Sequence, residues 1–216
     1  MGIVQEDPER HYFSSKVATD YDMLWSNVRM DEDNRKFIDN CYNRFYTMLP
    51  KNGIVLDAGC GTGIAESYLL REGFNVIGVD YSEDMLKIAR EKAPSVNFRR
   101  MDIRKLEFKE GTFDGILCAG GVLIHIMESE LDKVFGEFAR VLAKSGAVFI
   151  TTRAAEEQKE VVEEAHEGGK INVNYHTRNA VESSMQRCGF SIVNYAEEWD
   201  AVGRLFKYMY VHAKKA

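Results

Sequence analysis

Short apolar segments alternate with helical patterns along most of the chain, and this alternation limits the possible fold more than any other feature. Segments expected to be buried strands occupy residues 54–56, 76–79, 96–99, 113–117 and 147–150. Helical patterns separate most of them, and near-continuous apolar strands between helices are typical of a parallel sheet covered on both faces. The sequence therefore predicts an α/β fold with three layers, in which helices cover both faces of a parallel sheet.

Capping residues predict where the helices between these strands begin. Ser82 precedes two acidic residues and is expected to cap a helix that ends before Pro94. Ser129 is expected to cap a helix through residue 141, and Thr177 one that ends at Gly189. Side-chain oxygens at such positions accept hydrogen bonds from the free amides of the first helical turn.

The last third of the chain departs from this alternation. Residues 154–167 are rich in glutamate and are predicted to form a solvated helix. Residues 191–199 and 205–213 have no helix between them, so we expect an antiparallel hairpin at the end of the chain.

Residues 5–50 carry a helical pattern rich in aromatic side chains, which ends at a turn around Gly53. A chain of 216 residues that is 45% hydrophobic can form one domain with a modest appendage. We therefore expect residues 1–50 to form an N-terminal helical cap and residues 51–216 to form the main domain.

The composition narrows the expected compartment and partners. The formal net charge is -6, so the chain lacks the broad positive field that supports non-specific nucleic-acid binding. The N-terminus does not resemble a secretory signal, and no apolar run approaches the roughly 20 residues of a membrane span. The four cysteines form no metal-binding or disulfide pattern. We expect a cytoplasmic protein without nucleic-acid or membrane partners, either a monomer or a homodimer.

The strongest single signal is the segment 55–63, Val-Leu-Asp-Ala-Gly-Cys-Gly-Thr-Gly, which follows a strand and opens a helix. Ligands bind at this place in α/β sheets, and glycines let backbone amides approach them closely. No lysine follows the glycines as a phosphate-binding loop requires, and Ile64 stands where a dinucleotide fingerprint has its third glycine. Asp80, 17 residues after Gly63, ends the next strand and suits a pair of ribose hydroxyls.

The pattern Asp-x-Gly-x-Gly-x-Gly from Asp57 to Gly63 resembles motif I of the class I S-adenosylmethionine-dependent methyltransferases. The resemblance extends from residue 51 to the C-terminus and is closest to the small-molecule branch that includes the ubiquinone and menaquinone biosynthesis type. It implies a Rossmann-like three-layer fold with a seven-stranded, mostly parallel sheet whose last strand is antiparallel. It also implies S-adenosylmethionine as the cofactor, S-adenosylhomocysteine as the product, no metal, and a small-molecule substrate.

The resemblance also assigns the family's cofactor contacts to positions of this sequence. The glycine loop would line the methionine moiety, Asp80 would bind the ribose, and Asp102 with the amide of Ile103 would bind the adenine. The complete set of expected cofactor-binding residues is Tyr21, Asp57, Gly59, Cys60, Gly61, Gly63, Asp80, Tyr81, Met85, Asp102, Ile103, Cys118, Ala119 and Gly120.

Methyl transfer from a sulfonium depends on alignment more than on acid–base help, because the leaving group is neutral and already activated. His125 is the best-placed ionisable side chain and the catalytic candidate, although a structural role is the preferred interpretation. Two other hypotheses stay open: a cofactor-binding protein without transfer activity, and a methyltransferase that acts on a protein side chain. The missing third glycine opposes an NAD-dependent oxidoreductase.

Overall fold

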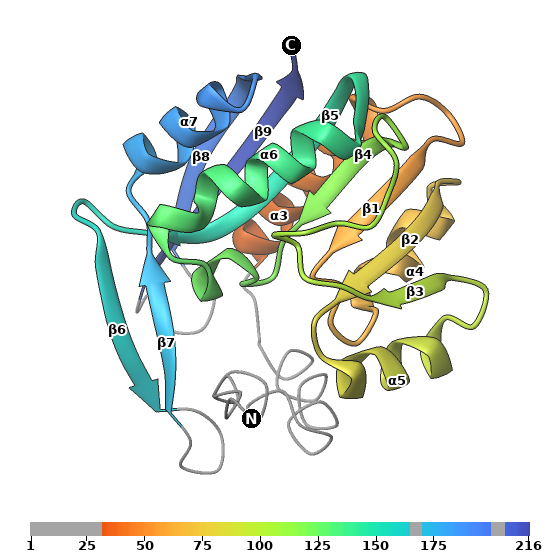
Figure 1. The fold of residues 1–216 in the computed structure, drawn as a ribbon, viewed down its shortest axis with the longest axis horizontal. Coiled ribbons are helices and arrows are strands. Elements are labelled where there is room, and N and C mark those ends of the chain that lie inside the picture. Colours follow the sequence, from red (N-terminus) through yellow and green to blue (C-terminus); the bar gives the residue numbers. More distant parts are fainter. Residues whose placement is uncertain (1–31, 165–169, 200–205) are drawn as a thin grey trace, which may run out of the picture.

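The computed structural model describes residues 32–164, 170–199 and 206–216, and its main feature is a seven-stranded sheet with the order β3-β2-β1-β4-β5-β9-β8 (Figure 1). The last strand, β9, runs antiparallel to both of its neighbours, and the other pairs are parallel. The predicted Rossmann-like sheet with an antiparallel last strand is therefore confirmed. The strands are β1 (Ile54–Ala58), β2 (Asn75–Asp80), β3 (Asn97–Arg100), β4 (Phe113–Cys118), β5 (Leu142–Ala154), β8 (Phe190–Trp199) and β9 (Lys207–Lys215).

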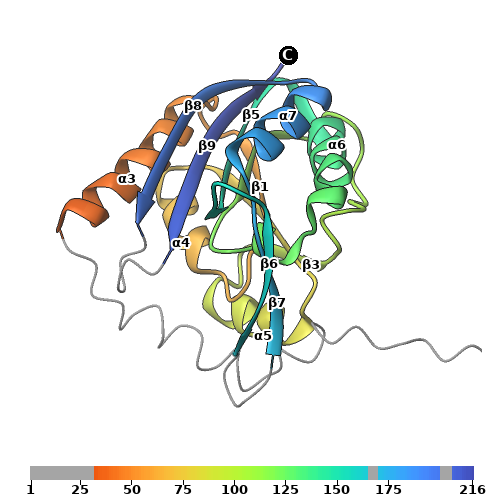
Figure 2. The same cartoon turned by 90° about the vertical axis from the view of Figure 1, so that its left-hand side faces the viewer.

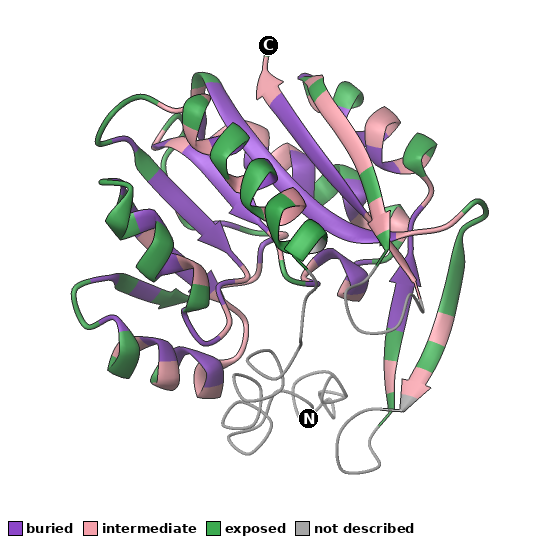
Figure 3. Ribbon diagram, turned by 180° about the vertical axis from the view of Figure 1, so that it is seen from behind, coloured by how far each residue is buried: buried purple, intermediate pink, exposed green. Residues whose placement is uncertain are grey.

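Helices cover both faces of this sheet. One face carries α3 (Glu32–Thr47), α4 (Ile64–Arg71) and α5 (Glu83–Lys92), and the other carries α6 (Leu131–Val141) and α7 (Arg178–Arg187) (Figures 1 and 3). Each face has its own apolar core, which the helices of that face close. Among the helices that the structure describes, none is long and apolar enough to cross a membrane.

Two of the three predicted helix starts are confirmed. The hydroxyls of Ser82 and Thr177 accept hydrogen bonds from amides three residues later, at 3.3 and 3.1 Å. The predicted cap at Ser129 was wrong, because a 3-10 turn, η2 (Glu128–Glu130), precedes α6 and the helix begins at Leu131. Such a turn pairs amides with carbonyls three residues earlier, which takes the place of a side-chain cap.

The prediction of an acidic helix over residues 154–167 was also wrong. This stretch contains β6 (Lys159–Glu164), which pairs antiparallel with β7 (Lys170–Tyr175) in a separate two-stranded ribbon (Figures 1 and 2). Val161 of β6 packs on a small apolar cluster that also contains Ile124, far away in the sequence. Glutamate has low strand propensity, so the local sequence did not reveal a strand that distant contacts stabilise.

Phe149 of β5 is the residue on which α3 docks. Its buried ring stacks on His212 of β9. The ring centroids are 4.4 Å apart for His212, and 5.3 and 6.1 Å apart for Tyr42 and Phe45 of α3. The His212 side chain donates a hydrogen bond to the Cys41 carbonyl of α3 at 2.8 Å. Burial lowers the pKa of His212, so the neutral ring is the form that packs here. These contacts hold α3 against the centre of the sheet.

Replacing this ring tests whether α3 is an integral layer of the fold. Phe149→Ala is expected to lower the free energy of unfolding by about 3–5 kcal/mol, because it removes a buried aromatic side chain and leaves a cavity. Val193→Ala, at a position of β8 that is 50% exposed, should change it by less than about 0.5 kcal/mol. Urea unfolding followed by circular dichroism measures both values, and equal effects of the two substitutions would contradict this packing.

Candidate functional site

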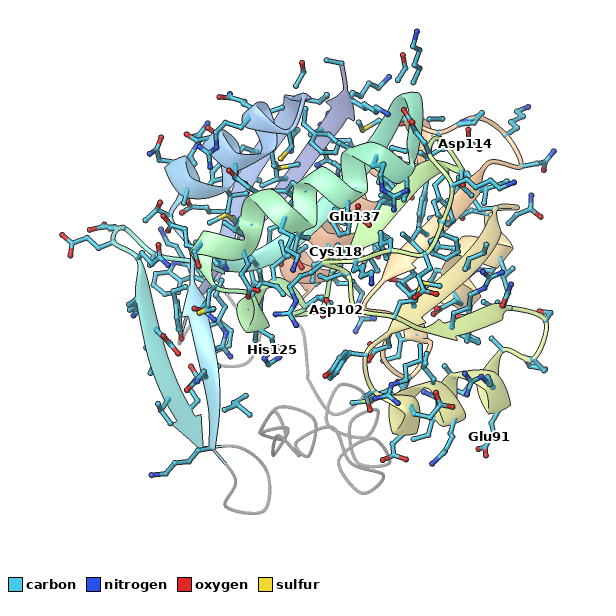
Figure 4. The ribbon with its side chains drawn as sticks, in the orientation of Figure 1. Glu91, Asp102, Asp114, Cys118, His125 and Glu137 are labelled. Carbon is cyan, nitrogen blue, oxygen red and sulfur yellow. The ribbon has the colours of Figure 1, made fainter. Side chains whose placement is uncertain are left out.

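The carboxyl ends of β1, β2 and β4 meet at one edge of the sheet, because these strands are parallel and β1 pairs with both of the others. The segments after them carry most of the predicted site residues. Figure 4 shows Asp102, which follows β3, and His125, in the short turn η1 (Leu123–His125), at this edge, with Cys118 at the end of β4. Asp114, at the start of β4, lies at the opposite end of the molecule.

The glycine loop between β1 and α4 is closed on one side and open on the other. Gly59, Gly61 and Gly63 all adopt left-handed backbone conformations, with φ of 86°, 55° and 79°. A Cβ at Gly59 would lie 2.3 Å from a methyl group of Val122, in the segment that follows β4. A Cβ at Gly61 would meet nothing within 4 Å. The loop therefore presents bare backbone to open space at Gly61, as a site for a closely bound ligand requires.

Asp80 ties this loop to the end of β2. Its two carboxylate oxygens accept hydrogen bonds from the amides of Gly61 at 2.9 Å and Ser82 at 2.8 Å. Burial raises the pKa of Asp80, and these backbone hydrogen bonds reduce the effect. A carboxylate has about four acceptor positions, so Asp80 can hold the loop and still accept hydrogen bonds from ligand hydroxyls.

Two further carboxyl groups are buried under the loop. Asp57 is 4% exposed and Glu66, in the first turn of α4, is 0% exposed. Burial, and then the neighbouring carboxyl groups of Glu66 and Asp80, raise the pKa of Asp57 well above its usual range. Burial also raises the pKa of Glu66 to about 7. The loop thus stands on a group of acidic side chains that are not all ionised at neutral pH.

The Arg104 guanidinium binds both oxygens of the Asp102 carboxylate. Its Nε and Nη2 atoms donate to the two Asp102 oxygens at 2.9 and 2.8 Å, and Nη1 donates to Glu130 at 3.1 Å. Partial burial of Asp102 opposes ionisation, but the hydrogen bonds and charge of Arg104 outweigh it and lower the pKa of Asp102. The side chain of Ile103 is buried in the core, which leaves only its backbone for a ligand. A ligand that used Asp102 would share it with Arg104.

The segment after β4 combines a buried thiol with an open backbone. Cys118 is fully buried, and burial raises the pKa of its thiol, so it is not a reactive thiolate at neutral pH. Ala119 is partly buried against the core on the α3 face. The amide of Gly120 donates to the Thr151 hydroxyl at 3.2 Å, and a Cβ at Gly120 would meet nothing within 4 Å. This segment therefore forms a second open stretch of backbone at the same edge.

His125 is half-buried in η1, and β7 fixes its position. Asn174 of β7, and His176 directly after this strand, donate hydrogen bonds to two carbonyls of η1, at 3.0 Å each. Burial, and then the charge of Arg153, lower the pKa of His125 to about 4. The ring is therefore neutral at neutral pH and is a weak base.

The remaining predicted contacts are Tyr21, Tyr81 and Met85. Tyr21 lies outside the described residues. Tyr81 directly follows Asp80, and its ring lies 5.8 Å from the Arg100 guanidinium. Met85, in the first turn of α5, is 2% exposed. Because Tyr81 follows Asp80 at the end of β2, it lies at this edge of the sheet. The Met85 side chain is buried.

Sequence reasoning missed three charged side chains near this edge. Glu66 occupies a first helical turn, where a carboxylate usually faces solvent and favours the helix dipole. Arg104 lies two residues after Asp102, and that spacing was the one signal available for their pairing. Arg153 forms an ion pair with Glu163 of β6 at 2.5 Å, and the wrong helix prediction concealed this partner.

A polar hollow of about 690 Å³ lies elsewhere, between η2, α6, α7 and the β6–β7 ribbon. Its lining includes Ser129, Asp132, Asn179 and Arg187, and none of the predicted cofactor-binding residues that lie in the described part of the chain. Within the described ranges, no group of three His, Cys, Asp or Glu side chains is placed to hold a metal ion. The predicted site residues that the structure describes meet at the glycine-loop edge and not in this hollow.

Comparisons with known proteins agree with this architecture. Residues 55–146 match the family model described as a methyltransferase domain. A phosphatidylethanolamine N-methyltransferase of Cereibacter sphaeroides is 33% identical over 140 residues, which cover 61% of this chain and 67% of that protein. A demethylmenaquinone methyltransferase of Thermus thermophilus is 32% identical over 146 residues, covering 63% and 62% of the two chains.

A solved structure of the Burkholderia thailandensis 1,6-didemethyltoxoflavin-N1-methyltransferase, with bound 1,6-didemethyltoxoflavin and S-adenosylhomocysteine, has the same fold. Its TM-score is 0.62 at 19% identity, with 100% of this chain and 93% of that chain covered.

The matched part is the half of the fold that carries the glycine loop, since the family model runs from β1 into β5. The chain spans between 43% and 67% of the length of the first four curated relatives that it matches. The predicted likeness to the quinone-biosynthesis methyltransferases is confirmed, since demethylmenaquinone and ubiquinone methyltransferases are among the relatives. The chain belongs to the class I S-adenosylmethionine-dependent methyltransferases.

Proposed function

We propose that this protein transfers the methyl group of S-adenosylmethionine to a small-molecule acceptor. The observation that carries the proposal is the open glycine loop, which Asp80 at the end of β2 holds in place. Gly61 offers bare backbone there, and Asp80 keeps acceptor positions for hydroxyl groups. A nucleoside with a ribose diol and an amino-acid tail has both of the features that such a site can bind.

The residues present fit this cofactor. The amides and carbonyls of the loop from Gly59 to Gly63 would hold the amino-acid end, and Asp80 would accept hydrogen bonds from the ribose hydroxyls. Asp102, kept ionised by Arg104, would accept from the adenine amino group. Tyr81 follows Asp80 and would pack against the adenine. The open backbone at Gly120 supports the methyl end of the ligand lying beside the segment after β4.

The cofactor supplies an activated methyl group on a sulfonium, with a neutral thioether as leaving group. The protein's contribution is then to orient the acceptor and to exclude water. The neutral His125 ring can hydrogen-bond an acceptor but removes a proton poorly, because its pKa is about 4. The buried Cys118 thiol is not available as a nucleophile. The chemistry therefore depends on alignment rather than on covalent or strong acid–base catalysis.

A small molecule is the acceptor class that the chain itself supports. The net charge of -6 gives no positive field for nucleic acid. The relatives named above carry small acceptors in their names, a phospholipid in one and a quinone precursor in the other. The open backbone after β4 leaves room for such a molecule beside the glycine loop.

Asp80 provides the first test of this assignment. Wild-type protein is expected to bind both S-adenosylmethionine and S-adenosylhomocysteine in thermal-shift titrations, because a ligand selective for the native state raises its stability. Asp80→Ala should weaken binding by about 1–3 kcal/mol through lost hydrogen bonds to a charged acceptor. The control is Asp84→Ala, in the first turn of α5, which should bind as the wild type does. No stabilisation of the wild type by either ligand would refute the proposal.

Gly61 tests whether the open side of the loop is the binding surface. Gly61→Ala is expected to weaken S-adenosylhomocysteine binding about tenfold or more, because the new methyl group takes space that the ligand needs. Gly111→Ala imposes similar backbone strain at φ 67°, its Cβ would make only an ordinary contact with Ala143 at 3.9 Å, and it lies away from the loop. Calorimetric titration should show weaker binding for the first variant alone. Equal affinities of the two variants would place the ligand elsewhere.

His125 tests the account of the chemistry. With the first acceptor identified from a panel of phenols, amines, thiols and carboxylates, His125→Gln should lower the turnover of labelled methyl groups less than about tenfold, since a general base contributes ~10²–10⁴-fold. The wild-type rate at saturating ligands should show no titration of His125 between pH 6 and 8, because its pKa of about 4 leaves it neutral throughout. A loss of a hundredfold that higher pH relieves, with cofactor affinity intact, would identify His125 as a base.

A further inference from the structure

Glu66 is buried without any visible structural reason. It is 0% exposed, and among the described residues neither of its carboxyl oxygens has a hydrogen-bond partner. An isolated ionised carboxylate is strongly disfavoured in such surroundings, and buried polar groups without partners are rare in native proteins. A buried carboxyl group of this kind is therefore a candidate for interaction with a bound ligand.

The register of the sheet places Glu66 next to the glycine loop. A Cβ at Gly78 of β2 would lie 2.8 Å from Glu66 Oε1, so the carboxyl group occupies the space that this glycine leaves. Gly78 pairs with Asp57 of β1, and Asp80 lies two residues further along β2. In-register neighbours on parallel strands share a face, and so do residues two apart on one strand. The three carboxyl groups therefore lie on the same face of the sheet, under the loop.

The charges around Glu66 are mostly negative. After burial, the charges of Asp57, Glu66 and Asp80 each raise the pKa of the Cys60 thiol in the loop. Among the described residues, the charge that lowers the pKa of Glu66 is that of Lys92 in α5, and it acts after the backbone amide of Glu66 itself. Three ionised carboxylates beside one lysine would leave net negative charge under the loop. A cationic ligand bound above the loop would neutralise that charge.

We propose that Glu66 carries a proton while the site is empty and releases it to the solvent when a cationic ligand binds at the glycine loop. This inference rests on the proposed function, because S-adenosylmethionine brings an ammonium group and a sulfonium group. A nearby cation favours the ionised form of a carboxyl group, so the proton that leaves Glu66 is matched by positive charge that the ligand brings. The ligand therefore binds more tightly as the pH rises through the region near 7.

Calorimetric titration with S-adenosylmethionine, in two buffers of different ionisation enthalpy, counts the released protons. At pH 7 the wild type should release about half a proton per ligand, because Glu66 has a pKa of about 7. Its affinity should be about fivefold lower at pH 6 than at pH 7, as a single coupled proton requires. Glu66→Gln, similar in shape but unable to ionise, should lose this proton release and most of the difference in affinity between the two pH values. Glu72→Gln, exposed at the end of the same helix, is the matched control and should behave as the wild type.

Stability without ligand gives an independent arm. Since burial raises the pKa of Glu66 from 4.5 to about 7, the folded wild type binds more protons than the unfolded chain in this range and loses stability as the pH rises through it. Glu66→Gln escapes this loss, so its melting temperature should exceed that of the wild type at pH 8 and approach it at pH 5. If the variant does not fold, carbon-13 NMR of the wild-type Glu66 carboxyl should show a midpoint near 7 that falls when ligand binds.

The outcomes separate this inference from the proposed function. Wild-type binding without proton release, undiminished release by Glu66→Gln, or a Glu66 midpoint that ligand does not move would overturn the role of Glu66 and leave the methyltransferase proposal intact. Failure of the wild type to bind S-adenosylmethionine at all would instead overturn the proposed function.

Discussion

The parallel pairing of β1 with β2 and β4 is the constraint on which the rest of the site depends. It brings the carboxyl ends of three strands to one edge, where the glycine loop, Asp80 and the segment after β4 become neighbours. The hydrogen bond from the Gly61 amide to Asp80 then joins the loop to β2. The two cores on either side of the sheet pack against the strands that carry this edge. A ligand that binds here meets a surface formed before it arrives, so little ordering free energy is lost on binding.

The same edge also gathers carboxyl groups that are buried from solvent. Asp57, Glu66 and Asp80 share one face of the sheet, and burial raises the pKa of each of them. This arrangement is unfavourable for the empty protein and favourable for a bound cation, because a nearby positive charge compensates ionised carboxylates. The buried carboxyl groups lower the folding stability of the empty protein and favour binding of a positively charged ligand. Such perturbed groups are common at functional sites.

Features that depend on local chemistry could be predicted from the sequence, and features that depend on distant contacts could not. The glycine loop and the caps at Ser82 and Thr177 follow from residues next to one another, and the parallel sheet follows from repeated apolar strands. In the β6–β7 ribbon, Val161 packs on the cluster of Ile124, Val173 and Tyr175, a contact that the glutamate-rich pattern conceals. Glu66 of α4 occupies space that Gly78 of β2 leaves free. Arg104 forms an ion pair with Glu130 at the start of α6. Neither contact leaves a periodic pattern in the sequence.

On the function proposed here, the cofactor binds at the glycine-loop edge. Amide hydrogen exchange with and without saturating S-adenosylhomocysteine tests it most directly, because exchange reports protection segment by segment. Bound ligand should slow amide exchange in residues 59–63, 80–82 and 102–104. Exchange along the polar hollow lined by Asp132 and Asn179 should not change. Protection confined to the hollow, with the loop exchanging as it does in the free protein, would contradict this placement of the cofactor.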